Sequence, residues 1–496
     1  MDSLSLRTAR GLLWSAVQRF GGQAISLAVF VLLSRLLTPT DMGLAAMAFV
    51  FLTLAQAFLD QGLGAAIVQR KDLEPEHIDS GFWWSTSLGV TLAAITLALA
   101  GPVAALLGEP RLAPVLMGMS PALVLTGLRI PQTALLQRSF RFRELAVRTI
   151  LAETIGGVVG IALALGGYGV WALVGQTLGR GGTATLILWR VVAWRPGLRF
   201  SWKHMKDLIR VGLPVLGDRL LDFARGKLDD LLVGAALGAA ALGYYSVGYR
   251  LLNFLTDLIV GTVQTVSLPL YSRLGREGRP LRGAFLEMNR LLAFLAVPTF
   301  LGIALMAPAM VPAFFGPQWA PSVPVMQILA VVGLLRVAPA AASPALTAIG
   351  KPSINLYVNL GATVVATIGF VAVVSQGIVP VALVHLFVAI GLLPVTLVIV
   401  HRVLALPLQP YLRSYVPAVP AAALMAIVLV GAAWWADGWP STLAGVMLLV
   451  AAGGAVYLGA TRLAAPDLFR RARQAFIQEQ SGTRWAEIPT ILEEDL

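Results

Sequence analysis

The chain has 496 residues, of which 57% are hydrophobic and only 12% are charged, with a formal net charge of +12. A soluble protein of this length carries about twice that charged fraction, so the composition excludes a soluble globular protein. The absence of cysteine excludes disulfides and thiolate metal sites.

Apolar runs long enough to cross a bilayer recur along the whole chain, which is typical of transmembrane helices. We predict about fourteen spans. Their ranges are 12–37, 43–68, 82–107, 112–136, 148–166, 169–192, 208–237, 240–272, 284–315, 321–349, 352–376, 378–401, 413–436 and 440–464. The first run is too long for a signal peptide and lacks a small-residue cleavage site, so we interpret it as a retained span. The fold class is therefore an all-α polytopic membrane protein.

The loops between the predicted spans fall into two sets that alternate along the chain. One set carries clusters of Arg and Lys, and the other carries one basic residue in total. The basic set contains Arg70, Lys71, Arg138, Arg141, Arg143, Arg148, Arg195, Arg199, Lys203, Lys206, Arg210, Arg273, Arg276, Arg279, Arg282, Lys351, Arg402 and Arg413. Because basic loops stay in the cytoplasm, both termini are predicted to be cytoplasmic. The same placement argues against nucleic acid as a partner.

The two halves of the chain resemble each other. "RLLTPTDMGLAAMAF" matches "AALGAAALGYYSVGY", which aligns Gly43 with Gly243, and a second match aligns Arg129 with Arg336. Six spans followed by six similar spans predict two pseudo-symmetric six-helix lobes around a central cavity. The predicted parts are an N-lobe over 1–192, a cytoplasmic linker over 193–207, a C-lobe over 208–402, an extra helix pair over 403–464 and a cytoplasmic tail over 465–496.

Several stretches resemble the Wzx-type lipid-linked oligosaccharide flippases of the multidrug/oligosaccharidyl-lipid/polysaccharide exporter superfamily. They are "LLSRLLTPTDMGLAAMAFVF", "GLGAAIVQRKDLEPEHIDSGFWWS", "PQTALLQRSFRFRELA" and "GGYGVWALVGQ". The resemblance implies two lobes that alternate in access. It implies, as cargo, an undecaprenyl-diphosphate-linked oligosaccharide, which is a repeat unit of exopolysaccharide, capsule or O-antigen. Transport would run from the cytoplasmic to the outer leaflet of the inner membrane, with a polysaccharide polymerase and co-polymerase as candidate partners.

The stretch "GDRLLDFARGKLDDLLVG", residues 217–234, contains seven charged residues in one predicted span. At about 100° per residue, Asp218, Asp222, Arg225 and Asp229 fall within roughly sixty degrees of one another. A charge at the centre of a membrane costs roughly 2.5–3.5 kcal/mol, so this face must meet water or opposite charge. We interpret the stretch as the lining of a cavity. Charges that pair with one another and join this span to its neighbours are the alternative.

Charged residues in other predicted spans extend this candidate site. Arginine is suited to a diphosphate because its planar fork binds two phosphate oxygens at once. The candidate substrate-binding cations are Arg19, Arg129, Arg180, Arg219, Arg225, Lys227 and Arg336. The candidate coupling or cavity acids are Asp60, Glu153, Asp218, Asp222, Asp229 and Asp257, with Na⁺ or H⁺ as the coupling ion. For Asp60, Glu153 and Asp257 a salt bridge to an arginine of another helix is the alternative, and for Arg19 it is snorkelling to the interface.

The sequence predicts no cofactor, no metal site and no enzyme. Its four histidines lie far apart, and no pair has the spacing of metal ligands on one helix. Neither a phosphate-binding G-x-x-x-x-G-K-[ST] loop nor a G-x-S-x-G motif occurs. A polysaccharide polymerase would need a large catalytic loop, and the predicted loops are short. Two transport alternatives stay open, namely a multidrug antiporter with an organic cation as cargo, and a lipid II flippase.

Overall fold

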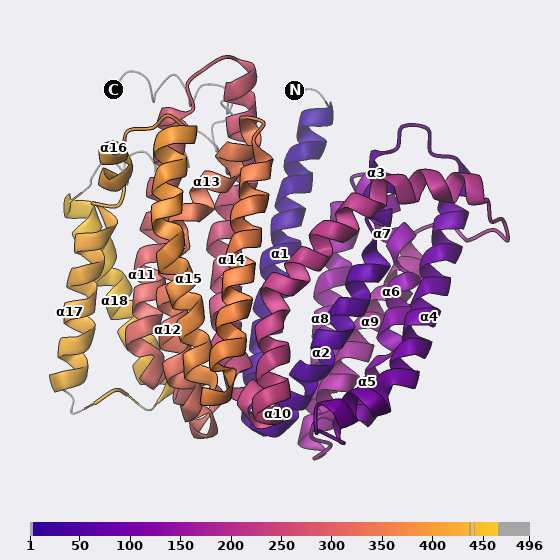
Figure 1. The fold of residues 1–496 in the computed structure, drawn as a ribbon, viewed down its shortest axis with the longest axis horizontal. Helices are drawn as coiled ribbons and strands as arrows, with labels where there is room; N and C mark the ends of the chain where they lie inside the picture. The colour runs from indigo at the N-terminus through magenta and orange to yellow at the C-terminus, as the bar shows by residue number, and fades with distance from the viewer. Residues whose placement is uncertain (1–2, 436–437, 441, 465–496) are drawn as a thin grey trace. The chain divides into compact units, whose positions relative to one another are not determined.

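The computed structural model describes residues 3–435, 438–440 and 442–464 (Figure 1). Every regular element in this described part is a helix, which confirms the predicted fold class. Twelve of the described helical segments are long and apolar enough to cross a membrane, so the chain is a multi-pass membrane protein. The predicted number of about fourteen spans is not confirmed. The longest of the twelve segments, Val215–Arg276, covers most of two predicted spans, 208–237 and 240–272. The predicted tail over 465–496 lies outside the described residues.

Contacts between residues divide the chain into two compact units. Unit 1 contains the residues up to Ser246 together with Phe370–Ile378, and unit 2 contains Val247–Gly369 and the residues from Val379 onward. The division falls inside one long helix, α10. The two six-helix lobes and the linker inferred from the sequence stay a prediction.

Unit 1 contains the helices of the N-terminal half of the chain. They are α1 (Ser3–Leu36), α2 (Pro39–Asp60), α3 (Leu63–Gln69), α4 (Pro75–Leu106), α5 (Leu112–Met119), α6 (Pro121–Gly127), α7 (Ile130–Arg138), α8 (Phe142–Leu165), α9 (Trp171–Val191) and the first part of α10 (Trp202–Arg276). The later elements are α11 (Arg282–Phe315), η1 (Pro317–Ser322), α12 (Val323–Leu335), α13 (Val337–Ala348), α14 (Pro352–Val373), η2 (Val374–Gln376), α15 (Ile378–Val398), η3 (Ile399–Val403), α16 (Leu408–Arg413), α17 (Ala418–Trp435) and α18 (Leu443–Ala464). Of these, only the end of α14, η2 and the first residue of α15 belong to unit 1.

Local sequence determines where α2 starts. Pro39 occupies its first turn, where a missing N–H costs no helical hydrogen bond. Thr38 Oγ1 accepts a hydrogen bond from the Asp41 N–H (3.2 Å), and the Asp41 carboxylate accepts one from the Thr38 N–H (3.2 Å). This reciprocal capping box satisfies N–H groups that lack helical partners. The predicted loop between the first two spans is therefore a tight turn.

Two of the predicted spans are interrupted at residues that the internal repeat aligns. The range 112–136 contains α5, α6 and α7, and Arg129 lies at the junction of α6 and α7. The range 321–349 contains α12 and α13, and Arg336 lies at the junction between them. Each unit thus has an arginine at a helix break, as the alignment of Arg129 with Arg336 would require of a structural repeat.

Gly43 and Gly243, which the repeat aligns, lie close together in unit 1, and each packs against the segment that contains the other. A Cβ atom added to Gly43 would overlap the carbonyl oxygen of Ala239, and one added to Gly243 would overlap the carbonyl oxygen of Pro39. The contact is reciprocal, because the alignment that pairs the two glycines also pairs Pro39 with Ala239. Only glycine allows two backbones to approach this closely. Just before this segment α10 kinks at Gly238 (φ 81°, ψ 178°), where the sequence predicted a break between two spans.

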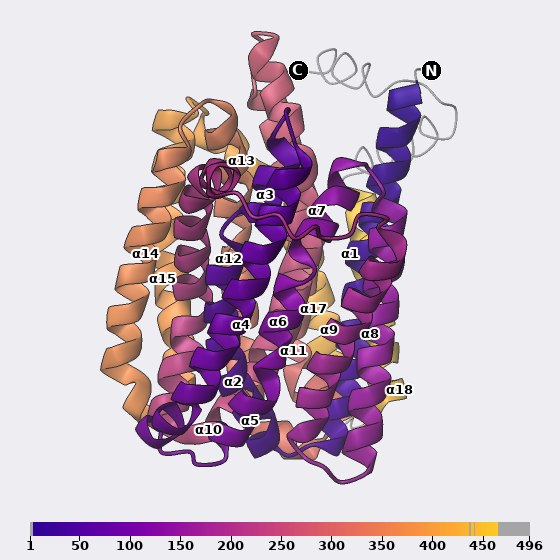
Figure 2. The same cartoon turned by 90° about the vertical axis from the view of Figure 1, so that its right-hand side faces the viewer.

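The loops of unit 1 gather at two ends, in the two sets that their charges predict. Among the basic loops, Arg70 donates a hydrogen bond to Asp207 (3.1 Å), and Arg138 donates hydrogen bonds to carbonyl groups at the end of α3. Among the other loops, the Ala239 N–H donates to the Glu109 carboxylate (3.3 Å). Figure 2 shows the connection from α9 to α10 crossing the end of the unit at which α3 and α7 lie. The placement of the basic end in the cytoplasm stays a prediction.

The last two long helices, α17 and α18, pack against α11 in unit 2 (Figure 1). Met306 of α11, Met425 of α17 and Tyr457 of α18 belong to one buried apolar cluster. The Tyr457 hydroxyl also donates a hydrogen bond to the carbonyl of Phe294 (2.8 Å), which satisfies its polar end. The helix pair that the sequence places after the twelfth span is therefore part of the packed unit.

Candidate functional site

The helices α8 and α9 form the frame of a candidate site in unit 1. Arg180 of α9 forms an ion pair with Glu153 of α8 (Nη1–Oε1 3.4 Å). The Glu153 side chain is only 16% exposed, whereas that of Arg180 is 43% exposed, so the guanidinium remains accessible beside a mostly buried carboxylate. The two helices approach closely because Gly156 lies against Arg180 and Gln176, where a Cβ atom would lie 2.8 Å from each. Small residues at such contacts are typical of membrane helix pairs.

Two more arginines lie close to this pair. Arg129, at the break between α6 and α7, donates a hydrogen bond to Thr126 Oγ1 (3.1 Å) and is within electrostatic range of Arg148 and Arg180. Arg148 of α8 donates to Thr133 Oγ1 (3.2 Å). The hydroxyl groups supply hydrogen bonds to these guanidinium groups but no negative charge.

The sequence assigned Arg148 to a basic loop, and this assignment is wrong. The helix α8 begins at Phe142 rather than at the predicted position 148, so Arg148 lies two turns inside it. The segment "FRELAVR" is too polar to resemble a membrane span but is a good helix former, which is why the hydropathy pattern missed it.

An open cavity of about 370 Å³, lined mostly by residues with polar side chains, lies between α1 and α8 in the same unit. It is lined by Ser15, Gln18, Arg19, Gly22, Gln23 and Ser26 of α1 and by Thr149 and Glu153 of α8. One carboxylate, Glu153, thus borders the cavity and also pairs with Arg180. We call Arg129, Arg148 and Arg180 the α8 arginine cluster. Arg19 lines the cavity on the other side of Glu153, which pairs with Arg180.

The charged stretch of α10 is mostly self-paired. Arg225 donates to Asp222 (2.6 Å) and Lys227 donates to Asp230 (2.6 Å), both within one helical turn as their spacing predicted. Asp229, which is 3% exposed, accepts a hydrogen bond from the Tyr245 hydroxyl (2.7 Å). These contacts favour the alternative of structural pairing for this part of the stretch.

The predicted acids outside this stretch differ in their surroundings. Arg219 forms an ion pair with Asp60 of α2 (3.2 Å), and both side chains are about half exposed. Asp60 and Glu153 are therefore both paired with arginines of other helices, which is the alternative considered for them. Asp218 is exposed at the start of the charged stretch. Asp257 and Arg336 belong to unit 2, and the other predicted residues belong to unit 1.

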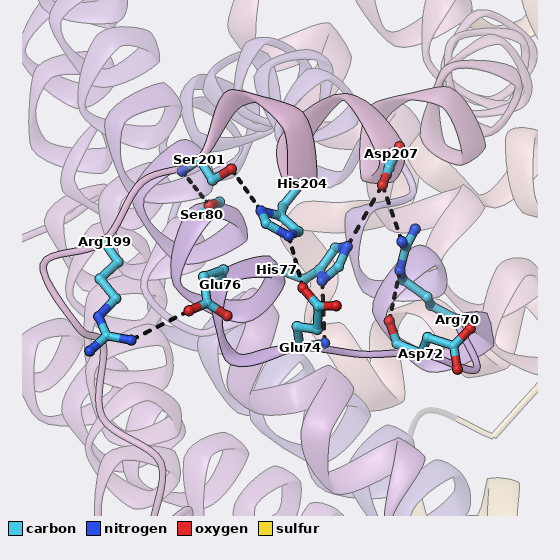
Figure 3. Close-up of polar contacts among 10 residues, drawn as sticks. All are labelled: Arg70, Asp72, Glu74, Glu76, His77, Ser80, Arg199, Ser201, His204 and Asp207. Atoms are coloured by element: carbon cyan, nitrogen blue, oxygen red, sulfur yellow. Dashed lines mark hydrogen bonds and ion pairs between the residues drawn. The ribbon is translucent and has the colours of Figure 1, made fainter.

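A second polar cluster joins the start of α4 to the start of α10 (Figure 3). His204 Nε2 lies 2.9 Å from Glu74 Oε2, and His77 Nε2 lies 3.8 Å from Asp207 Oδ2. The aromatic rings of His77 and His204 are in edge contact, with centroids 4.4 Å apart. From the sequence we predicted no metal site, because no two histidines have ligand spacing on one helix. The tertiary structure brings His77 and His204 together from different helices.

Comparison with known proteins places the chain in a family. Residues 32–324, more than half of the chain, match the family model described as "Polysaccharide biosynthesis protein". The chain belongs to the polysaccharide biosynthesis protein family. The predicted membership is thereby confirmed.

Relatives of the chain include several bacterial biosynthesis proteins. The teichuronic acid biosynthesis protein TuaB of Bacillus subtilis is 25% identical over 435 residues, which cover 87% of this chain and 90% of that protein. The succinoglycan biosynthesis transport protein ExoT of Rhizobium meliloti is 27% identical over 72% of each chain. The lipopolysaccharide biosynthesis protein WzxC of Escherichia coli is 25% identical over 67% of this chain and 70% of its own.

Solved structures show the fold. The lipid II flippase MurJ in an inward closed conformation superposes with a TM-score of 0.74 at 15% identity, over 92% of this chain and all of that chain. An inward-facing multidrug MATE transporter of the MOP superfamily has a TM-score of 0.54 at 19% identity, over 78% of this chain and 93% of its own. The chain therefore has the fold of this transporter superfamily.

Proposed function

We propose that this chain is a flippase that moves a lipid-linked oligosaccharide across the membrane for polysaccharide biosynthesis. The family and the fold support a transporter of a polysaccharide precursor. The relatives are named for the biosynthesis or transport of teichuronic acid, succinoglycan and lipopolysaccharide. We infer that the cargo of this chain is a sugar precursor carried on undecaprenyl diphosphate.

The α8 arginine cluster is the observation that carries this proposal. Arg129 and Arg148 are bound to threonine hydroxyls and Arg180 pairs with Glu153, so this cluster carries more positive than negative charge, which is costly in a membrane without an anion. A diphosphate supplies two or more negative charges, and its oxygens match the planar fork of arginine. An organic cation, the cargo of a multidrug antiporter, would be repelled by the same groups. We therefore favour a diphosphate lipid over the antiporter alternative.

In the proposed cycle, the diphosphate and its sugars enter the open cavity between α1 and α8 from the cytoplasmic side while the polyprenyl chain stays in lipid. The arginines replace the water that hydrates the phosphates. The protein then closes on the cytoplasmic side and opens outward, as in alternating access. Export of negative charge is favoured by a membrane potential that is negative inside. Glu153, which lines the cavity, is our candidate for binding a coupling H⁺ or Na⁺.

The direct test is flipping of a fluorescent undecaprenyl-diphosphate oligosaccharide in proteoliposomes that contain the purified protein. The same preparation is assayed for transport of a cationic dye. Flipping without dye transport is the expected result. Dye transport without flipping would assign the chain to the multidrug antiporters, and flipping of lipid II alone would make it a cell-wall precursor flippase.

A further inference from the structure

The histidine cluster, which we define as Glu74, His77, His204 and Asp207, lies at the first turns of two helices. Glu74 caps the N-terminus of α4 and His77 lies in its first turn. His204 and Asp207 lie in the first two turns of α10. Each helix thus offers one acid and one histidine three residues apart, and Figure 3 shows the two pairs facing each other. Pairs of acid and histidine at this spacing place both side chains on one face of a helix.

The distances in the cluster suit a small ion. One ligand atom from each of Glu74, His77 and His204 can be chosen so that all three lie within 4.8 Å of one another. The ligand atoms of a tetrahedral zinc ion lie roughly 3.4 Å apart, because the bonds are about 2.0–2.1 Å long. Asp207 Oδ2 lies 3.8 Å from His77 Nε2, but Asp207 is not part of the group of three.

His77 provides an independent indication that a ligand is needed. It is 1% exposed, and its Nε2 atom is buried with no hydrogen-bond partner in the described structure. Its Nδ1 atom accepts a hydrogen bond from the Glu74 N–H (3.2 Å), so Nε2 is the nitrogen that points towards Asp207 (Figure 3). Buried polar atoms are almost always satisfied, and one that is not requires an explanation such as an ion.

The surroundings of His204 fit the same ion. Its Nδ1 atom lies 2.7 Å from Ser201 Oγ, and the Ser201 N–H in turn donates to Ser80 Oγ (2.9 Å). A hydrogen bond from Nδ1–H to a neighbouring oxygen fixes the tautomer in which Nε2 is free to bind a metal. Nε2 is the atom that faces Glu74.

We propose that the histidine cluster binds a divalent transition-metal ion of the zinc type. Two imidazole nitrogens and one carboxylate oxygen are a donor set that suits Zn²⁺ better than Mg²⁺ or Ca²⁺. Binding through His77 Nε2 requires the ring proton on Nδ1, so the hydrogen bond from the Glu74 N–H to Nδ1 is lost and the capping box of α4 opens. Asp207 also pairs with Arg70 (3.1 Å), whose positive charge would partly oppose the ion.

The consequence of this site is mechanical. An ion held by Glu74, His77 and His204 would join the first turn of α4 to the first turns of α10, the helix that continues into the charged stretch. This inference does not depend on which cargo the protein moves.

The test is a calorimetric titration of ZnCl₂ into the full-length purified protein in detergent, after removal of bound metal with a chelator. The wild-type protein is expected to bind about one Zn²⁺ per chain, and His204→Ala to bind it at least tenfold more weakly. Glu74→Gln keeps an acceptor for the helix cap and should also weaken zinc binding without loss of folded protein. His401→Ala, which removes a histidine elsewhere, is the matched control and should bind like the wild type.

Replacing Zn²⁺ by Co²⁺ gives a second, spectroscopic measurement that does not depend on the stability of the protein. A tetrahedral site with nitrogen and oxygen ligands gives visible absorption bands, and these should disappear in His77→Ala and His204→Ala. The proposal is overturned if the wild type binds no stoichiometric zinc, or if the histidine variants and Glu74→Gln bind it as tightly as the control. In that case the cluster is a hydrogen-bonded clamp without a metal.

Discussion

The α8 arginine cluster and the charged stretch of α10 are both rich in ionisable side chains, but they differ in how these charges are balanced. In the stretch of α10, most of the described charges have opposite charges or a hydroxyl beside them, at 2.6–3.2 Å. Around α8, Arg180 pairs with Glu153, whereas Arg129 and Arg148 are bound to threonine hydroxyls instead of carboxylates. A dense run of charges in the sequence can therefore be a structural network, whereas scattered single arginines can converge on one site.

This contrast changes the ranking of the residues predicted from the sequence. Arg180, Arg129 and Arg19 are now the principal candidates for diphosphate binding, and Arg148 joins them. Arg225 and Lys227 are engaged with acids on the same helix turn. The predictions below start from the largest difference expected between the two regions.

The largest effect is expected for substitutions of Arg180 and Arg225. A hydrogen bond to a charged group contributes about 1.5–3 kcal/mol, so Arg180→Ala should slow flipping by roughly tenfold to a hundredfold. Arg225→Ala should change it by less than about threefold, because that guanidinium is half exposed and pairs with Asp222. Flipping rates in proteoliposomes, normalised to the amount of reconstituted protein, measure both. Equal losses in the two variants would remove the distinction between the regions.

The coupling role proposed for Glu153 can be separated from binding. Glu153→Gln keeps the size of the side chain but cannot bind H⁺ or Na⁺ as a carboxylate does. We expect flipping to continue with no dependence on the Na⁺ or H⁺ gradient, whereas Asp222→Asn should keep the wild-type dependence. Rates measured with imposed ion gradients test this. An unchanged ion response in Glu153→Gln would exclude this residue as the coupling acid.

The close contact between α8 and α9 should be sensitive to one added methyl group. Gly156→Ala places a Cβ atom against the Arg180 side chain and the Gln176 backbone, and overpacking of this kind costs about 1–3 kcal/mol. Gly182→Ala on α9 is the matched control, because no atom lies within 4 Å of its added Cβ. Unfolding in detergent with increasing denaturant measures the difference. Equal stability of the two variants would show that the helices are less tightly packed than we describe.

Within the stretch of α10, the contacts of the buried Asp229 should contribute more to the free energy of unfolding than those of the exposed Asp222. Tyr245→Phe removes the hydroxyl that binds the buried Asp229 and should lower the free energy of unfolding by about 1–3 kcal/mol. Asp222→Asn at the exposed pair should change it by less than about 0.5 kcal/mol. The same unfolding assay applies. A larger effect at Asp222 would contradict the structural role assigned to the buried end.

The smallest effect is expected for the pair of Lys227 and Asp230. A double-mutant cycle with Lys227→Met and Asp230→Asn should give a coupling energy of up to about 1 kcal/mol in stability, because the lysine is partly exposed. The cycle should give no coupling in the flipping rate. Coupling in transport but not in stability would move this pair into the cargo path.

The helices could be predicted well from the sequence, because a long apolar run identifies a membrane helix without any knowledge of its tertiary contacts. Helix occupies most of the described part of every predicted span, and the break at Gly238 falls within the sequence "ALGAAALG", which we predicted to be a loop. The repeat also proved informative, since Gly43 and Gly243 meet each other's segments and Arg129 and Arg336 both lie at helix breaks.

The pairing of charges could not be predicted from the sequence. Asp60 and Arg219, or Glu153 and Arg180, come from helices whose mutual rotation depends on packing, and no local pattern encodes it. The convergence of His77 and His204 depends on the connection that follows α9, which has no regular structure to read. Arg148 was missed because a polar first turn hides the start of α8.

The most direct test of our account is equilibrium binding of undecaprenyl diphosphate to the purified protein, with undecaprenol as the uncharged control lipid. The α8 arginine cluster predicts binding that needs the diphosphate, weakens at least about tenfold in Arg180→Ala and is nearly unchanged in Arg225→Ala. Binding of both lipids with equal affinity, or loss of binding in Arg225→Ala alone, would contradict it.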